Sequence, residues 1–100
     1  MRCTYFLFEG AFSDNAPEHK GRKLFSSVMI PSADEEEAYK IFLAELKYEG
    51  INLIQIEDRF IFDPAEVDFG NPENARWVSL YTEVVRFRQS IFTPWQLYEE

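Results

Sequence analysis

The strongest constraint on the fold is a capped, amphipathic segment near the middle of the chain, PSADEEEAYKIFLAELKYEG. Ser32 is followed three residues later by Glu35, which is the spacing of a capping box at the start of a helix. Gly50 follows the segment, and glycine is the common residue just after a helix end. The segment therefore predicts a helix over residues 33–49. The apolar stripe of that helix consists of Ala38, Phe42 and Leu46.

Segments that are typical of strands lie on both sides of this helix. Residues 3–9 (CTYFLFE) and 23–30 (KLFSSVMI) are rich in β-branched and aromatic residues, and we expect them to pair as a hairpin across a polar loop over residues 10–22. Residues 51–57 (INLIQIE) predict a third strand, and a short strand over residues 59–62 can follow it.

The last third of the chain predicts a second helix and a final strand. Asn71-Pro72-Glu73 combines an N-cap residue, a proline at the first helical position and an acid in the first turn, and the helix is predicted to run to about Arg88. Residues 90–98 (SIFTPWQLY) fit an edge strand, because Pro94 cannot donate a ladder hydrogen bond. They also fit a tail whose aromatic side chains close the core.

The predicted order is β-β-α-β-(β)-α-β, which is a single α+β domain over residues 1–100. We expect a mostly antiparallel sheet of four to five strands with both helices packed on one face. The other face would then be partly exposed to water or covered by a partner. Hydrophobic residues make up 46% of the chain and aromatic residues 17%, which is enough to build a core.

The charge of the chain limits its partners. Eighteen acidic residues stand against ten basic ones, for a net charge of −8, which repels nucleic acid and anionic membranes and favours basic proteins. Cys3 is the only cysteine, so no internal disulfide can form. The chain has no apolar run of the length that a signal peptide or a membrane span requires. We therefore expect a cytoplasmic protein that binds neither nucleic acid nor membrane.

The sequence offers no catalytic set, so we expect a protein that is not an enzyme and uses no cofactor. His19 is the only histidine and lies in a polar loop, while Cys3 lies in a predicted core strand. No glycine-rich phosphate loop and no zinc spacing occur. Asp63, Glu66 and Asp68 could offer oxygen atoms to a cation, but their spacing does not match a calcium loop. We therefore expect no metal site.

The most informative segment is EDRFIFDPAEVDFGNPE, residues 57–73. It holds six acidic residues against one basic residue, a local charge of −5, with aromatic residues interleaved. Such a combination suits recognition, because rings bury area and carboxylates steer and pair with Arg or Lys. Equally, Phe60 and Phe62 can anchor the segment to the core while the acids are solvated. The candidate partner-binding residues are Asp58, Asp63, Glu66, Asp68, Phe69 and Glu73.

The stretch SVMIPSADEEEAYKIFLAELKYEGINLIQIED resembles small bacterial immunity proteins of toxin–immunity loci, including those of contact-dependent growth inhibition. The terminal FTPWQLYEE resembles the aromatic strand that ends many such chains. The resemblance implies a non-enzymatic, cytoplasmic protein that binds and neutralises a cognate toxin, often a basic nuclease domain. It identifies no site residue, because these families vary their binding surface.

Two other functions are compatible with the same features. One is a phage-type acidic mimic of nucleic acid that blocks a defence complex, and the other is a small-molecule-binding regulatory module. Exposed edge strands also allow either a monomer or a weak homodimer.

Overall fold

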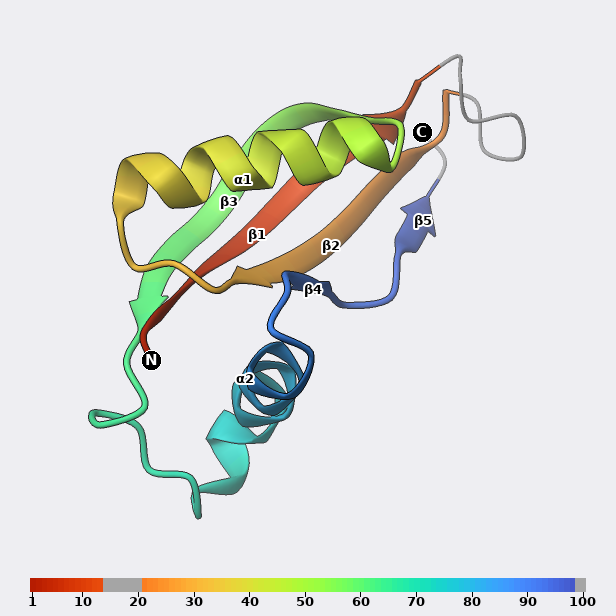
Figure 1. The fold of residues 1–100 in the computed structure, drawn as a ribbon. Coiled ribbons are helices and arrows are strands. Elements are labelled where there is room, and N and C mark those ends of the chain that lie inside the picture. The colour runs from red at the N-terminus through yellow and green to blue at the C-terminus, as the bar shows by residue number, and fades with distance from the viewer. Residues whose placement is uncertain (14–20, 99–100) are drawn as a thin grey trace.

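The computed structural model describes residues 1–13 and 21–98, and Figure 1 shows their arrangement. Within these residues, one antiparallel sheet of five strands and two helices form a compact α+β domain, which confirms the predicted fold class. The predicted loop over residues 10–22 falls in part on residues outside this description. The elements are β1 (Cys3–Phe12), β2 (Lys23–Ile30), α1 (Glu35–Tyr48), β3 (Ile51–Phe62), η1 (Pro72–Asn74), α2 (Ala75–Phe87), β4 (Ile91–Phe92) and β5 (Gln96–Tyr98).

The sheet is built around the hairpin of β1 and β2. Its strand order is β3-β1-β2-β4, and β5 pairs with the same edge of β2 further along that strand. All of these pairings are antiparallel. The predicted pairing of the first two strands is confirmed, and β1 continues three residues beyond its predicted end.

Residues 51–62 form one strand, not the strand and separate short strand that the sequence predicts. The pairing of β3 with β1 shifts twice, and Ile54 and Glu57 are left without a partner in the register. Each extra residue breaks the two-residue alternation of side chains, which explains why the pattern looks interrupted. Next to the second shift the two strands approach closely, since a Cβ on Gly10 would lie 2.6 Å from a side-chain atom of Ile51.

The two helices pack on opposite faces of the sheet, so the prediction that they share one face is wrong. Phe6 and Phe8 of β1 belong to the core cluster that includes α1, whereas Cys3 and Tyr5 belong to the cluster that includes α2. Alternate residues of a strand point to opposite faces. Because β1 is apolar on both faces, each face can hold a helix, and Figure 1 shows α1 and α2 well apart.

Helix α1 begins two residues later than predicted and is capped by a different residue. The Asp34 carboxylate accepts a hydrogen bond from the backbone N–H of Glu37 at 2.8 Å, and Asp34 has the extended backbone of an N-cap. Ser32 instead accepts from the backbone N–H of Asp34 at 3.3 Å. A carboxylate at this position gains from the helix dipole as well as from the hydrogen bond, which favours Asp34 over a serine hydroxyl.

The buried face of α1 is the predicted one, formed by Ala38, Phe42 and Leu46. The ring of Phe42 stacks on Phe6 with centroids 4.4 Å apart and meets Phe8 edge-on at 5.2 Å. These three rings form the centre of the larger core cluster. Aromatic contacts of this kind add to the stabilisation that the buried area provides.

Helix α2 starts at the predicted place through a short 3₁₀ turn. The Asn71 side chain accepts from the backbone N–H of Glu73 at 3.0 Å and caps that turn. The helix buries Leu80 and Val84 against the second core cluster. It covers only the part of the sheet near Cys3, so the rest of this second face has no helix over it.

Residues 90–98 satisfy both alternatives that the sequence left open. Strands β4 and β5 pair with the edge of β2, with Pro94 in the connection between them. Trp95, in the same connection, contacts Phe12 and Phe92 edge-on at 6.4 Å and 5.1 Å and packs on the α1 side of the core. The tail is therefore an edge of the sheet and a closure of the core at once.

Candidate binding surface

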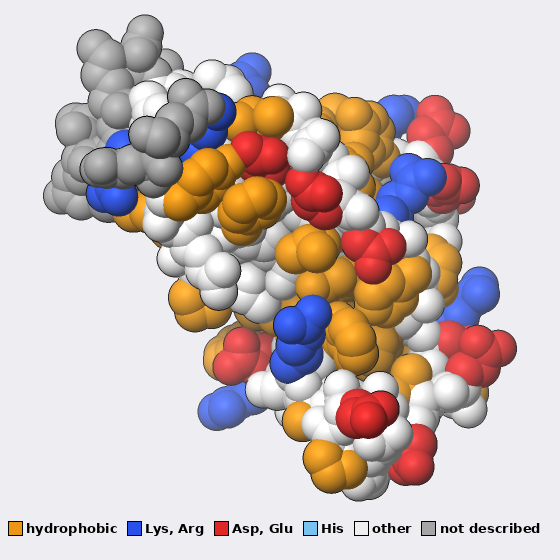
Figure 2. Space-filling view, turned by 180° about the vertical axis from the view of Figure 1, so that it is seen from behind, with side chains coloured by type: hydrophobic (Ala, Val, Ile, Leu, Met, Phe, Trp, Pro, Cys, Tyr) orange, Lys and Arg blue, Asp and Glu red, His pale blue; other side chains and the backbone are white. Residues whose placement is uncertain are grey.

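The face of the sheet opposite α1 carries acidic and aromatic side chains next to one another. Glu9 of β1 lies between Phe25 of β2 and Gln55 of β3 in the register, and directly opposed residues share a face. Asp58 is opposed to Leu7 on the same face. Figure 2 shows hydrophobic side chains over the middle of this face with acidic ones among them. We call this surface the acidic–aromatic face; it consists of Glu9, Phe25, Gln55, Glu57, Asp58 and Tyr98.

A glutamine and a tyrosine hold the two glutamates of this face. The Gln55 amide nitrogen donates to Glu9 Oε2 at 3.3 Å and also to Glu57 Oε1. The Tyr98 hydroxyl donates to the second oxygen of Glu9. An ionised carboxylate has about four acceptor positions, so both glutamates keep capacity for further donors. The Gln55 amide thus positions the carboxylates of Glu9 and Glu57, and both can still accept hydrogen bonds from a partner.

An aromatic pair lies beside these carboxylates. The rings of Phe25 and Tyr98 stack with centroids 4.9 Å apart and an interplanar angle of 19°. Burial, followed by the hydrogen bond to Glu9 and the charges of Glu9 and Glu57, raises the pKa of Tyr98 to about 12. Tyr98 therefore keeps its proton near neutral pH and remains a hydrogen-bond donor to Glu9.

The one basic residue of the 57–73 segment is turned away from this face. Arg59 is opposed to Phe6, on the α1 side of β3, and its guanidinium lies 2.7 Å from a carboxylate oxygen of Glu35. The acids of residues 57–73 on the opposite side of the sheet are therefore not neutralised by it. Carboxylates beside exposed rings form a surface that suits a guanidinium or ammonium group, through charge-assisted hydrogen bonds and cation–π contact.

Of the six candidate residues from the sequence, only Asp58 lies on this face. Asp63, Glu66, Asp68 and Phe69 lie in the loop after β3, and Glu73 lies in η1. Asp58 and Asp63 are five residues apart along the chain, about 17 Å of extended strand. The structure thus divides the predicted set between a strand and a loop at its end.

Two of the loop acids also have a local structural role. Asp63 accepts from the backbone N–H of Ala65 at 3.0 Å, and Asp68 accepts from the backbone N–H of Gly70 at 2.9 Å. Each of these hydrogen bonds closes a turn in which the aspartate side chain takes the place of a backbone acceptor. Part of the acidic charge of residues 57–73 therefore has a local structural reason.

Phe69 combines the two roles that the sequence left open. It remains 47% exposed, yet its ring lies 6.4 Å from that of Phe62 and 6.2 Å from that of Tyr81. The ring therefore ties the loop to the α2 side of the core and still presents an edge to solvent.

The structure describes Cys3, one of the two candidate catalytic residues. Cys3 is buried, and burial raises the pKa of its thiol, which disfavours the reactive thiolate. His19 lies outside the described residues. In residues 1–13 and 21–98, no three His, Cys, Asp or Glu side chains group closely enough to hold a metal ion.

Neither of the two helices in the described part of the chain is long and apolar enough to cross a membrane.

The sequence did not identify the other five residues of the acidic–aromatic face, which are Glu9, Phe25, Gln55, Glu57 and Tyr98. One signal was present, because Glu9 is a charged residue at the end of an apolar strand that is predicted to be buried. A charged residue there must reach solvent or a partner. The contact between Glu9 and Tyr98, 89 residues apart, depends on the pairing of β5 with β2 and has no local signature.

Comparisons of the chain with protein-family models, with curated proteins and with solved structures each give no significant match.

Proposed function

We propose that this chain is a non-enzymatic inhibitor that binds a basic protein through its acidic–aromatic face. The partner we propose is a cognate toxin, a basic nuclease domain, which makes the chain a cytoplasmic immunity protein. One observation carries the proposal: Glu9 and Glu57 are held on the Gln55 amide beside the stacked Phe25–Tyr98 pair, on a sheet face that α1 does not cover.

The chemistry of this surface fits an arginine or lysine side chain of the partner. Glu9 and Glu57 each have an acceptor position left, and a planar guanidinium can use two at once. The ring of Phe25 is 37% exposed and offers a face to the same cation. Hydrogen bonds to charged groups contribute about 1.5–3 kcal/mol each, and arginine and tyrosine are frequent centres of binding energy in interfaces.

The loop acids supply a second contribution, to the rate of encounter. Asp63, Glu66, Asp68 and Glu73 lie beyond the end of β3, with Phe69 half exposed among them. Together with the net charge of −8 they attract a basic domain, and steering of this kind raises association rates by about 10–10³-fold. If the partner is a nuclease, these carboxylates would occupy the positions on its surface that otherwise bind the phosphates of nucleic acid. These residues therefore form the rim of the proposed interface.

We also propose that the protein acts as a monomer, with at most weak self-association through β3. This edge strand has two register shifts in its pairing with β1 and carries the charged run Glu57-Asp58-Arg59. Bulges and charges are the features by which edge strands avoid pairing with copies of themselves.

The test measures binding of the chain to basic domains encoded beside it, and growth rescue when both are expressed together. Replacing Glu9 and Glu57 with glutamine removes two charges from the face and keeps the hydrogen-bonding shape. The matched control replaces Glu36 and Glu37 of α1, two exposed acids on the opposite side of the sheet, with glutamine.

Both variants change the net charge by the same amount. We expect the face variant to bind about tenfold more weakly or worse, and the α1 variant to bind almost as the unmodified chain does. No binding and no rescue with any neighbouring product would reject the inhibitor proposal. Equal loss in the two variants would reject this face as the interface.

A further inference from the structure

A cleft of about 390 Å³ lies between the second face of the sheet and the first turns of α2. The connection between β4 and β5 closes it on another side. Its apolar lining includes Tyr5 and Leu7 of β1, Phe25 of β2 and Trp77 of α2. The volume falls at the lower end of the range of small-molecule sites, about 300–1,000 Å³. The cleft is thus large enough for one small aromatic molecule.

Three hydroxyl side chains that line this cleft, those of Ser26, Ser27 and Thr93, are already hydrogen-bonded. The Thr93 hydroxyl oxygen lies 3.0 Å from Ser27 Oγ and accepts from the Ser27 backbone N–H at 3.0 Å. The Ser26 hydroxyl donates to the Thr93 carbonyl oxygen at 3.0 Å. These groups hold the chain after β4 against β2, so their hydroxyls are not free for a ligand, and the one charged group that the described residues contribute to the lining is Arg76 of α2.

Two hydrogen-bond donors at the start of α2 have no acceptor among the described residues. The Arg76 guanidinium lies 5.0 Å from the centre of the Trp77 ring, and no carboxylate of the described residues pairs with it. The buried indole N–H of Trp77 has no hydrogen-bond partner among the same residues. Both residues lie in the first turn of a 13-residue helix, where the dipole favours negative charge. The unpaired guanidinium and the helix dipole therefore favour a ligand that carries negative charge.

We propose that this cleft binds a small carboxylate with an aromatic body. The Arg76 guanidinium pairs with the carboxylate, and the ring lies against Tyr5, Phe25 and Trp77. An arginine presents two parallel N–H groups to a carboxylate, whereas a neutral ligand would leave the guanidinium unpaired. Phe25 lines both this cleft and the acidic–aromatic face, but the inference does not rest on the proposed inhibitor function, because its ion pair is made by Arg76, which lies outside that face.

The test uses phenylacetate as the probe and phenylacetamide as its uncharged counterpart. Binding is followed in ¹H–¹⁵N spectra of the full chain at millimolar probe, and a Trp77→Phe variant assigns the indole N–H signal. We expect phenylacetate to move the Trp77 indole signal in a saturable way and phenylacetamide to bind at least about tenfold more weakly.

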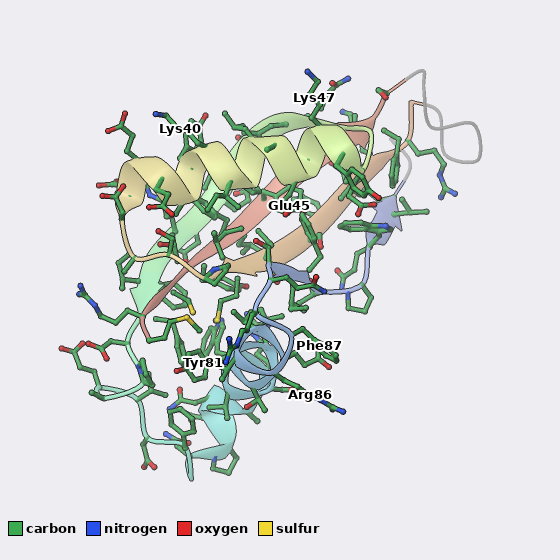
Figure 3. The ribbon with its side chains drawn as sticks, viewed as in Figure 1. Lys40, Glu45, Lys47, Tyr81, Arg86 and Phe87 are labelled. Carbon is green, nitrogen blue, oxygen red and sulfur yellow. The ribbon has the colours of Figure 1, made fainter. Side chains whose placement is uncertain are left out.

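Arg76→Gln tests the proposed ion pair, and Arg86→Gln is its matched control. Arg86 lies in the last turn of the same helix, and Figure 3 shows it pointing away from the sheet. Both side chains are exposed, so neither change should unfold the chain. We expect Arg76→Gln to weaken phenylacetate binding about tenfold or more, Arg76→Lys to restore part of it, and Arg86→Gln to leave it unchanged.

Three results would overturn the proposal. The first is the absence of any saturable shift with phenylacetate, and the second is equal binding of the acid and the amide. The third is equal weakening by the Arg76 and Arg86 substitutions, which would show that only the net charge matters. None of these outcomes bears on the acidic–aromatic face, so the two proposals fail separately.

Discussion

Replacing Thr93 with valine removes one hydroxyl group and keeps the branched shape of the side chain. That hydroxyl accepts the backbone N–H of Ser27 at 3.0 Å and lies 3.0 Å from the Ser27 hydroxyl oxygen. Ser27 is only 6% exposed, so water cannot replace the lost partner freely. The Ser26 hydroxyl is spared, because it still has the carbonyl oxygen of residue 93 at 3.0 Å.

The expected cost follows from the two Ser27 groups that lose a partner. A buried donor or acceptor left unsatisfied costs about 1–3 kcal/mol, and two such groups on one residue give a loss of about 2–6 kcal/mol. Thr93→Ser keeps the hydroxyl and loses one methyl group, which costs about 0.8 kcal/mol. For a domain of this size the valine variant should melt about 10 °C or more below the unmodified chain.

Urea unfolding of both variants measures the difference. We expect a lower midpoint for Thr93→Val with an unchanged slope, because the exposed surface on unfolding stays the same. The double variant Ser27→Ala with Thr93→Val should lose less than the sum of the single changes, since one unsatisfied hydroxyl is gone. If Thr93→Val is as stable as Thr93→Ser, the argument that these hydrogen bonds hold the chain end to β2 is refuted.

Three further predictions concern the core, the first helix and the hydrogen bond between Tyr98 and Glu9. Phe42→Ala should cost about 3–5 kcal/mol in urea unfolding, and a loss below 1 kcal/mol would contradict its place at the centre of the aromatic core. Asp34→Ala should cost about 1 kcal/mol and Ser32→Ala less, and the reverse order would reject Asp34 as the cap. Ultraviolet titration should find the pKa of Tyr98 near 12, and Glu9→Gln should lower it; an unchanged value would contradict their hydrogen bond. Because the folded-state pKa of Tyr98 is raised, its contribution to stability is present below pH ~10 and is lost as the pH rises through the folded value.

The sequence predicts local structure well where the responsible groups are close along the chain. The first helix, its buried stripe and the start of the second helix at Asn71 depend on neighbours within one or two turns. The sequence predicts Ser32 as the cap of the first helix, but Asp34 lies at the same end, and serine and aspartate are both favoured caps. The hydrogen bond from Glu37 and the backbone conformation of Asp34, which only the structure gives, identify Asp34 as the cap.

The placement of the helices and of the candidate site could not be predicted in the same way. Phe6 and Tyr5 are both apolar and lie on opposite faces of β1, so the pattern permits a helix on either face. The acidic–aromatic face joins Glu9, Gln55 and Tyr98, which come together only through strand pairing. A charge count along residues 57–73 finds Asp58 but cannot separate it from Asp63, which the structure places in a turn of the following loop.

The central claim is that the acidic–aromatic face, and not the loop after β3, forms the centre of the interface. Its most direct test is the rate of association and dissociation with the basic partner at several salt concentrations, for two variants of equal charge. One carries Glu57→Gln and Asp58→Asn on the face, and the other carries Asp63→Asn and Asp68→Asn in the loop.

Rim charges act mainly on association, and central charges act on dissociation. We expect the face variant to dissociate faster at every salt concentration. We expect the loop variant to differ only in slower association at low salt. Faster dissociation of the loop variant, with the face variant unchanged, would contradict the claim that the acidic–aromatic face is the centre of the interface.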